Sequence, residues 1–415
     1  MNNTTFLEKL LDGAEVEWVA LGKVAEKISS GGTPKTGISE YYDGEIPWLR
    51  TQEVDFGEIW DTGVRITEEG VDNSSARWIP ANCVIIAMYG ATVGKIGINK
   101  IPMTTNQACA NIQLNEDTLN FRYLFHLLCS KYEYIKSLGS GPQTNINAGI
   151  VKKLQIPIPC PENPEKSLAI QAEIVRILDT FTELTAELTA ELTAELTARK
   201  KQYNYYRDQL LTFEEGAVET FPLHEIAHFR NGKGHEKIID ENGSCVVVNS
   251  KFISTRGAVR KYSSEQLCPL FKNDILMVMS DLPHGKALAK CFLVDQDDQY
   301  TLNQRIGAFS VKDENIISTK FLFYILDRNR QLLRFDNGAD QTNLRKGEIL
   351  SIKIPVPSKD EQARIVAILD KFDTLTHSIS EGLPREIELR QKQYEYYRDV
   401  LLNFPKPEPQ TEGVA

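Results

Sequence analysis

The residues that could carry catalytic chemistry do not form a recognisable catalytic set. The chain has no (Asn/Asp)-Pro-Pro-(Tyr/Phe) stretch for an amino-methyltransferase, and no Gly-rich turn in a clear βαβ unit for its cofactor. YGATVGKI (Tyr89–Ile96) superficially suggests a phosphate loop, but three residues rather than four separate its glycines. Ile96 also stands where a metal-binding Ser or Thr would be needed. We therefore expect no catalytic residues in this chain.

Metal and thiol chemistry are equally poorly supported. His224 and His228 are four residues apart without a third ligand, so packing or capping explains them better than zinc does. GSCVV (Gly243–Val247) lacks a nucleophile elbow. The seven cysteines form no CxxC pair, which suits a reducing cytoplasm. The start has no signal-peptide pattern, and apolar runs such as Cys83–Met88 are too short to span a membrane. We expect a cytoplasmic chain with no metal site and no membrane contact.

Chain length and net charge limit the number of domains and the kind of nucleic-acid binding. A chain of 415 residues can form two or three domains, each with a real core. Its net charge of −10 argues against indiscriminate nucleic-acid binding, but it leaves binding through local patches open.

Two segments repeat each other and organise the rest of the chain. RKKQYNYYRDQLLTF (Arg199–Phe213) and RQKQYEYYRDVLLNF (Arg390–Phe404) agree at 11 of 15 positions, in a register of 390 − 199 = 191 residues. The same register relates the longer segments Gln171–Phe213 and Gln362–Phe404. Inside the first copy lies a shorter repeat, TAELTAELTAEL (Thr185–Leu196). The protein is therefore an internal duplication.

Each repeated segment predicts a long amphipathic helix. Apolar residues from Ile170 to Leu188 alternate steps of four and three, as a coiled-coil seam requires, and the second copy has the same pattern. Because each apolar stripe is narrow, we expect the two helices to pack on each other. Gly382 and Pro384 should kink or briefly break the second. The alternative is that the TAEL tract is a solvated linker of good helix formers.

Outside the helices lie two units of one plan. Both carry short β-branched runs, then a helix (Thr118–Ser137 or Ser318–Arg334), then a polar loop and an IP(I/V)P run. We interpret the first of these runs as a linker into the long helix. Three landmarks recur at offsets of 197 to 198 residues: TTNQA with TLNQR, QTN with QTN, and IPIP with IPVP. The first halves of the units share almost nothing. Shared scaffolds with different faces suggest two different recognition surfaces.

This organisation resembles the specificity subunit of bacterial type I restriction-modification enzymes, in particular the type IC branch. The TAEL tract with its flanking RKKQYNYYRDQLL carries the resemblance, which covers essentially the whole chain. It implies an α+β fold with two mixed α/β target-recognition domains, separated by two long antiparallel coiled-coil helices with a pseudo-twofold internal repeat. The expected segments are an N-terminal segment packing with the helical spacer (1–12), the first target-recognition domain (13–157), the central long helix (158–215), the second target-recognition domain (216–356), the distal long helix (357–404) and a disordered tail (405–415).

The resemblance also implies a function. The chain would be a non-catalytic subunit that recognises a bipartite double-stranded DNA target with a fixed gap. It would dock two methyltransferase subunits and, through them, restriction subunits. No cofactor is expected in this chain, because S-adenosylmethionine, ATP and Mg would belong to the partner chains. In the type IC branch the number of TAEL copies sets the gap length.

Helix geometry offers a physical account of the gap. Four residues lengthen a helix by about 6 Å and turn the chain beyond them by a net rotation of about 40°. One base pair of B-DNA advances about 3.4 Å and turns about 36°. The rotations match closely and the lengths loosely, so we expect removal of Thr193–Leu196 to shorten the gap by one base pair.

Base reading requires Arg or Lys toward guanine and Asn or Gln toward adenine, whereas phosphates accept bonds from Lys, Arg, Ser and Thr. Polar residues on the predicted loops of the first unit are the candidates there: Thr33, Lys35, Arg50, Tyr89, Thr92, Lys95, Gln143, Thr144 and Asn145. The second-unit candidates are Lys233, His235, Lys251, Arg256, Arg260, Lys261, His284, Lys286, Gln341, Asn343 and Arg345. Asn106–Gln107 and Asn303–Gln304 occur in both units, so we expect them to support the scaffold.

Apolar and aromatic residues at the two helix ends are the predicted partner-docking residues: Tyr203, Tyr206, Leu210, Tyr394, Tyr397 and Leu401. Two other classes of function remain open. A coiled-coil adaptor with two protein-binding heads would show no preference among DNA sequences. A fused enzyme with an unrecognised active site would turn over substrate without a partner.

Overall fold

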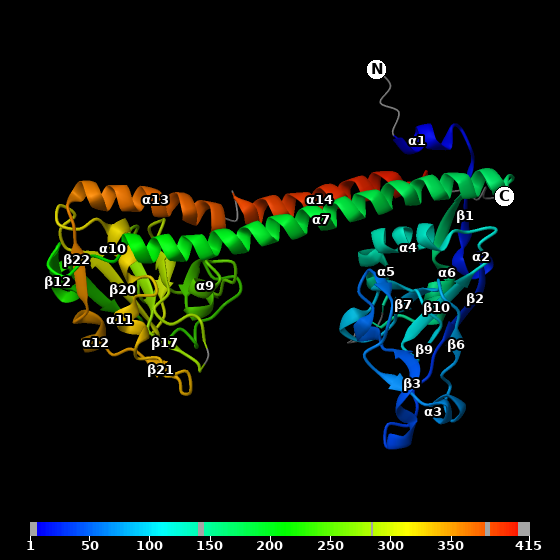
Figure 1. Cartoon of the computed structure of the whole chain (residues 1–415), viewed down its shortest axis with the longest axis horizontal. Coiled ribbons are helices and arrows are strands. Elements are labelled where there is room, and N and C mark those ends of the chain that lie inside the picture. Colours follow the sequence, from blue (N-terminus) through cyan, green and yellow to red (C-terminus); the bar gives the residue numbers. More distant parts are fainter. Residues whose placement is uncertain (1–5, 140–144, 284, 378–381, 406–415) are drawn as a thin grey trace. The chain divides into compact units, whose positions relative to one another are not determined.

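The computed structural model describes residues 6–139, 145–283, 285–377 and 382–405 (Figure 1). The chain divides into two compact units: unit 1 comprises residues 1–191 and 387–415, and unit 2 comprises residues 192–386. Each unit therefore joins a mixed α/β part to stretches of the long helices. The finer boundaries expected from the sequence stay a prediction.

The first repeated segment forms one long helix, as expected. Helix α7 runs without interruption over Pro164–Leu210, 47 residues. Pro164 suits the first helical position, where the missing N–H costs no hydrogen bond. The TAEL tract lies inside this helix, and the division between the units falls within it.

The second repeated segment forms two helices, α13 (Lys359–His377, 19 residues) and α14 (Leu383–Leu402, 20 residues). Gly382, just before α14, has φ +80°, which other residues rarely adopt. An added Cβ there would lie 2.6 Å from the carbonyl oxygen of Thr374. The interruption expected at Gly382 and Pro384 is therefore confirmed.

Each unit contains one antiparallel helix pair (Figure 1). In unit 1, α7 packs on α14, where the rings of Phe181 and Tyr397 stack with centroids 5.4 Å apart. In unit 2, α7 packs on α13, where the rings of Tyr206 and Phe372 stack at 5.6 Å. The two contacts correspond under the 191-residue register, since 181 + 191 = 372 and 206 + 191 = 397. The repeat in the sequence is thus also a structural repeat.

The described residues of unit 1 form three sheets. The five-stranded sheet has the order β2 (Ala25–Ser30), β10 (Cys109–Leu114), β7 (Val84–Ala87), β8 (Ile96–Asn99) and β4 (Glu58–Ile59). The four-stranded sheet has the order β5 (Arg65–Ile66), β3 (Tyr42–Leu49), β9 (Met103–Thr105) and β6 (Trp78–Ile79). The third pairs β1 (Val16–Ala20) with β11 (Gln155–Pro159). The helices besides α7 and α14 are α1 (Phe6–Leu11), α2 (Leu21–Val24), α3 (Glu68–Asp72), α4 (Phe121–Ser130), α5 (Tyr132–Ser137) and α6 (Ala148–Lys153).

Unit 2 repeats this plan. Its four-stranded sheet has the order β13 (Ala227–Asn231), β20 (Ile306–Val311), β16 (Ile275–Val278) and β18 (Cys291–Leu293). Its other sheets are β15 (Tyr262–Ser263), β14 (Cys245–Val248) and β19 (Tyr300–Leu302); β12 (Glu219–Pro222) with β22 (Lys353–Val356); and β17 (Ser280–Asp281) with β21 (Thr342–Asn343). Its helices besides α7 and α13 are α8 (Leu223–Ile226), α9 (Ser250–Ser254), α10 (Thr319–Leu326), α11 (Arg330–Leu333) and α12 (Lys346–Leu350).

The landmarks of the sequence lie at equivalent places in the two units. TTN and TLN lie on or beside β9 and β19, each of which pairs in parallel with the strand β3 or β14. The IPIP and IPVP runs are edge strands β11 and β22, so the interpretation of the first as a linker was wrong. An edge position tolerates their prolines because one side of an edge strand makes no ladder bonds.

The helices share the cores of the units they cover. In unit 1, Ile174 and Leu178 of α7 and Leu401 of α14 are buried in one cluster with Leu7 of α1 and Tyr123 of α4. In unit 2 the corresponding cluster joins α7, α13 and α10 through Tyr203, Ile365, Leu369, Phe321 and Leu322. Among the described residues, no helix is long and apolar enough to cross a membrane.

Candidate nucleic-acid interface

In unit 2 the loop after β16 and the QTN loop lie side by side. Ser280 and Asp281 of β17 pair with Asn343 and Thr342 of β21, and the backbone N–H of Leu344 donates to the carbonyl of Met279 at 2.8 Å. The side-chain amide of Gln341 donates to Ser280 Oγ at 2.9 Å. The pairing brings together four predicted residues that are all exposed: Lys286, Gln341, Asn343 and Arg345. His284 lies outside the described residues.

Unit 1 brings the same two loops together. The N–H of Ile146 donates to the carbonyl of Met88 at 3.0 Å, which is the bond that Leu344 makes to Met279 in unit 2. Tyr89 follows Met88 and is 40% exposed. Asn145 precedes Ile146, and its side-chain oxygen has no hydrogen-bond partner among the described residues. Gln143 and Thr144 lie outside those residues.

A second pair of equivalent loops, one at Gly31 and one at Gly232, passes close to the backbone at the ends of the parallel strands β9 and β19. An added Cβ on Gly31 would lie 1.8 Å from the carbonyl oxygen of Thr105, and one on Gly232 would lie 2.1 Å from that of Asn303. Only glycine permits this approach. The exposed candidates Thr33, Lys35 and Lys233 come shortly after these glycines in their respective units. Thr33 also hydrogen-bonds the side chain of Gln107.

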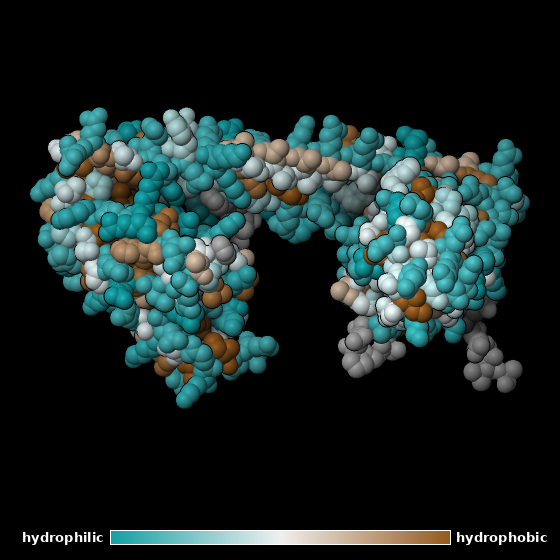
Figure 2. Space-filling model, turned by 60° about the horizontal axis from the view of Figure 1, so that its bottom comes forward, coloured by the Kyte–Doolittle hydropathy of each residue, from teal (hydrophilic) through white to brown (hydrophobic). Residues whose placement is uncertain are grey.

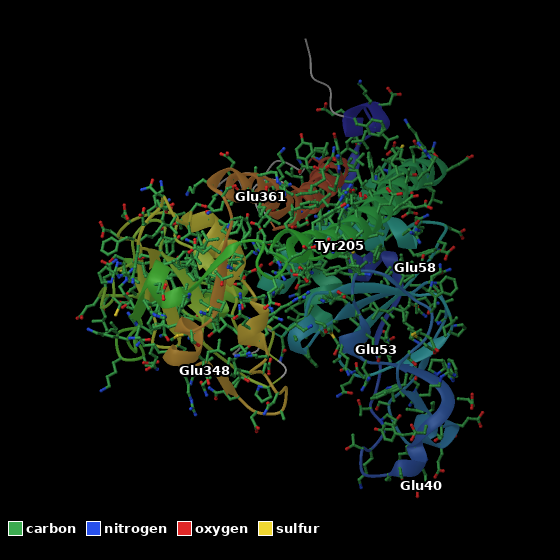
Figure 3. The ribbon with its side chains drawn as sticks, turned by 60° about the vertical axis from the view of Figure 1, so that its left-hand side comes forward. Glu40, Glu53, Glu58, Tyr205, Glu348 and Glu361 are labelled. Carbon is green, nitrogen blue, oxygen red and sulfur yellow. The ribbon has the colours of Figure 1, made fainter. Side chains whose placement is uncertain are left out.

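Three candidates of unit 1 are partly engaged within the unit. Arg50 Nε lies 3.3 Å from Glu53 Oε1, and Figure 3 labels Glu53. Lys95 Nζ lies 2.7 Å from Asp55 Oδ1 and 5.7 Å from the centre of the Phe56 ring. Thr92 donates to the carbonyl of Thr51 at 2.8 Å. These contacts hold local structure, so Tyr89 is the more accessible candidate of this region.

His235 is not a surface residue. It is 1% exposed, Nδ1 lies 2.8 Å from the carbonyl oxygen of Lys233, and Nε2 lies 2.9 Å from Thr301 Oγ1. Both ring nitrogens are satisfied inside unit 2, so this residue supports the Lys233 loop. The prediction that His235 contacts DNA was therefore wrong.

The basic segment Arg256–Lys261 divides into two kinds of residue. Arg256 Nη1 lies 2.9 Å from Asp373 Oδ1 of α13, so this guanidinium ties its loop to the helix. Both arginines are exposed, but Arg260 makes no ion pair with a described residue, and its Nε donates within the segment to the carbonyl of Gly257 at 3.0 Å. Lys251 and Lys261 are also exposed. Arg260 is therefore the better placed cation.

The shared Asn-Gln pairs support the scaffold, as expected. Asn106 accepts from the N–H of Ala108 at 3.1 Å, and Asn303 accepts from the N–H of Arg305 at 3.4 Å. The backbone N–H of each asparagine donates to the neighbouring parallel strand, to Leu49 or Val248. The same turn therefore closes both units.

An aspartate of α7 anchors unit 1 to its helix. Arg122 of α4 donates to both carboxylate oxygens of Asp179, at 2.7 and 2.8 Å, and also to Glu58 at 2.5 Å. His126 Nε2 lies 2.7 Å from Asp179 Oδ1. Burial alone would raise the pKa of Asp179, but the hydrogen bonds from His126 and Arg122 outweigh burial and lower it. Figure 3 labels Glu58.

Unit 2 has an anchor of different composition at the same place. Asp370 corresponds to Asp179 in the 191-residue register and accepts from Lys320 Nζ at 2.5 Å and from Tyr324 Oη at 2.6 Å. Burial and the bond to Asp370 raise the pKa of Tyr324. Neither aspartate was predicted from the sequence. Their recurrence in the repeated ILD tripeptide was the signal that could have found them.

The predicted partner-docking residues mostly pack within the units. Tyr203 and Leu401 are only 5% and 4% exposed, so the prediction that these two residues dock a partner was wrong. Tyr206 and Tyr397 stack on Phe372 and Phe181 and are each 40% exposed, while Leu210 and Tyr394 are half-buried. The neighbouring Tyr205 and Tyr396 face solvent more fully, at 61% and 65% exposed, and Figure 3 labels Tyr205. They are equivalent in the repeat, since 205 + 191 = 396.

A cavity lies at the end of the repeated helix motif in each unit. The cavity of unit 1, about 980 Å³, is mainly apolar and is lined by Trp18, Leu128, Tyr134, Tyr396, Leu402 and Phe404, among others. That of unit 2, about 460 Å³, contains many charged groups, including Arg207, Asp208, Asp327, Arg328 and Arg330. The two cavities lie at equivalent positions of the repeat, but one is lined mainly by apolar groups and the other by many charged groups. Within the described parts of the chain, no group of three His, Cys, Asp or Glu side chains is placed to hold a metal ion.

Comparison with protein families gives two matches that coincide with the internal repeat. Residues 14–198 and 215–389 both match the family described as the Type I restriction modification DNA specificity domain. The chain is 40% identical to the type I restriction enzyme EcoR124I/EcoR124II specificity subunit of Escherichia coli, over 98% of this chain and 99% of that relative. It is 36% identical to the EcoprrI specificity subunit of the same species, over 92% of this chain and 93% of the relative.

Two solved structures share the fold at low sequence identity. One, from a study of complex assembly and conformational transition of the type I R-M system, gives a TM-score of 0.66 at 15% identity and covers 93% of this chain and 97% of its own. The other is the HsdS subunit from Thermoanaerobacter tengcongensis, with a TM-score of 0.52 at 16% identity, covering 94% and 95%.

Proposed function

Because the chain belongs to the family of type I restriction-modification DNA specificity subunits, we propose that its two units read the two halves of a split DNA target. As a specificity subunit it recognises DNA and leaves catalysis to other chains. The finer assignment, one half-site for each unit with a fixed gap between them, is supported by a single observation. Both units pair the same two loops by the same hydrogen bond, at Met88 or Met279, yet carry different side chains there.

The polar composition of these loops suits a duplex. In unit 2, Gln341 and Asn343 carry amides that match adenine edges, and Lys286 and Arg345 carry charges that match phosphate or guanine. In unit 1, Tyr89 and Asn145 hold the corresponding positions. Figure 2 shows one side of the molecule, on which hydrophobic residues form small separate patches among hydrophilic ones. Such a surface favours a polar ligand over a large apolar one.

We further propose that Tyr205 and Tyr396 mark the docking sites of two methyltransferase subunits, to which restriction subunits would attach. Exposed tyrosines are frequent anchors of protein interfaces, and these two recur at one position of the repeat. S-adenosylmethionine, ATP and Mg would be bound by the partners. A cytoplasmic location follows from this proposed role on cellular DNA.

Methylation mapping tests the proposal directly. Genomic DNA from a strain with the gene should carry one split methylated motif with a constant gap, and a strain without the gene should lack it. The purified chain should bind this motif weakly, and strongly after the methyltransferase is added. If deletion of the gene removed no motif and the chain bound all sequences equally, a coiled-coil adaptor would be indicated instead.

A further inference from the structure

Leu282 of unit 2 is exposed to an unusual degree for an apolar residue. It is 66% exposed, the highest value among the large hydrophobic residues that the structure describes. It directly follows β17, which pairs with β21 in the candidate interface. A single exposed leucine is common on protein surfaces, so its neighbours decide whether this one has a role.

The exposure of Leu282 comes from a constrained turn. The Asp281 carboxylate accepts the N–H of Leu282 at 3.0 Å through Oδ1, and those of Ala287 and Leu288 at 2.7 and 3.1 Å through Oδ2. Gly285 donates to the carbonyl of Leu282 at 2.9 Å. An added Cβ on Gly285 would lie 2.2 Å from Asp281 Oδ2, so the backbone at Gly285 lies close to this carboxylate. These bonds fix the backbone beside Leu282, whose side chain is exposed.

Polar groups suited to DNA surround this apolar tip. Lys286 is exposed in the same turn, and Gln341 and Asn343 are exposed on or beside the adjoining strand β21. Gln341 is also joined to the turn through Ser280. A duplex offers phosphates to the lysine, base edges to the amides and stacked base faces to an apolar side chain.

We propose that Leu282 is a wedge that enters the base stack within the half-site read by unit 2. This inference rests on the proposed function and adds a way of reading sequence through deformation. Apolar side chains inserted between bases unstack one step and kink the duplex, and pyrimidine–purine steps open most easily. The half-site of unit 2 should therefore contain such a step at the position where Leu282 enters.

The test uses the full chain with its methyltransferase and the target found by methylation mapping. Duplexes carry the fluorescent base 2-aminopurine at successive positions of the half-site of unit 2. Wild-type complex should raise the fluorescence at one step, and Leu282→Ala should abolish that rise and weaken binding about tenfold, a loss equal to part of one buried leucine. Leu282→Met, of similar volume, should retain both properties.

Two further variants separate this effect from others. Lys286→Ala should weaken binding and lower the slope of log affinity against log salt by about 0.9, whereas Leu282→Ala should leave the slope unchanged. Ile316→Ala removes another exposed apolar side chain of unit 2, 44% exposed, and should change neither signal nor affinity.

The outcomes distinguish the wedge from the function on which it rests. If the wild-type complex prefers its target and Leu282→Ala behaves like the wild type, the wedge is refuted and the proposed function stands. If Leu282→Ala impairs only assembly with the methyltransferase, Leu282 contacts protein and the wedge is also refuted. A wild-type complex without sequence preference would overturn both proposals.

Discussion

Two arginines of the basic segment Arg256–Lys261 make different contacts, and their removal should have different effects. Both are exposed, but Arg256 is held by Asp373, whereas Arg260 has no ion-pair partner among the described residues. Arg260→Ala should weaken binding to the half-site of unit 2 and lower the salt slope by about 0.9, since one phosphate contact is lost. Arg256→Ala should leave that slope near the wild-type value and increase hydrogen exchange in its loop.

Affinity titrations from low to high salt measure this difference. An equal loss of slope in both variants would place Arg256 on DNA despite its ion pair. No loss in either would remove the segment from the interface.

The Asp179 anchor should make the stability of unit 1 depend on acid pH. Asp179→Asn loses the charge in the bonds from Arg122 and His126, so we expect the free energy of unfolding of unit 1 to fall by about 2 kcal/mol near neutral pH. In the wild type the folded-state pKa is lowered, so this stabilisation is present above the pKa of the unfolded carboxyl, about 4. It is lost as the pH falls through the lower folded-state pKa.

Denaturant unfolding of the full chain at several pH values, with hydrogen exchange assigning the effect to unit 1, tests this expectation. Asp179→Asn should flatten the acid dependence. Asp117→Asn, an exposed carboxyl in the same unit, is the matched control and should leave it unchanged. A wild-type acid slope that persists in Asp179→Asn would assign it to other carboxyls.

At the scale of elements, the two aromatic contacts of the helix pairs should act separately. Phe181→Ala removes the stack on Tyr397 in unit 1, and Phe372→Ala removes the stack on Tyr206 in unit 2. Since both phenylalanines are partly exposed, each change should cost about 2 kcal/mol, below the value for a fully buried ring.

Hydrogen exchange resolved by segment provides the measurement. Phe181→Ala should increase exchange in α14, and Phe372→Ala should increase it in α13. If either variant loosened the helix of the other unit instead, the helix pairs would form one cooperative structure.

Secondary-structure elements could be predicted best from the sequence where a periodic pattern extends over many residues. The helical period and the repeat predicted α7, and Gly382 with Pro384 predicted the interruption before α14. The pairing of β17 with β21 could not be predicted, because Asp281 and Thr342 are 342 − 281 = 61 residues apart and neither strand has a periodic pattern. The burial of His235 was missed for a similar reason, since its partner Thr301 lies on a distant strand.

At the scale of the whole molecule, α7 connects the two units through the TAEL tract, where the compact units divide. The residues there are half or fully exposed and helical, so the tract can change length without removing a core residue. Deleting Thr193–Leu196 removes one full repeat and preserves the sequence pattern on both sides. We therefore expect a folded protein that methylates the same two half-sites.

The gap between the half-sites should nevertheless change. Four helical residues correspond to about 6 Å and a net rotation of about 40°, while one base pair corresponds to about 3.4 Å and 36°. Rotation determines which side of the duplex each unit meets. The match between the helix rotation and the twist of one base pair should therefore matter more than the mismatch in length, and the gap should shorten by one base pair. Methylation mapping of the deletion strain measures the gap, and Glu191→Ala within the tract is the control that alters sequence without altering length. An unchanged gap in the deletion strain would mean that α7 does not set the distance between the two reading surfaces.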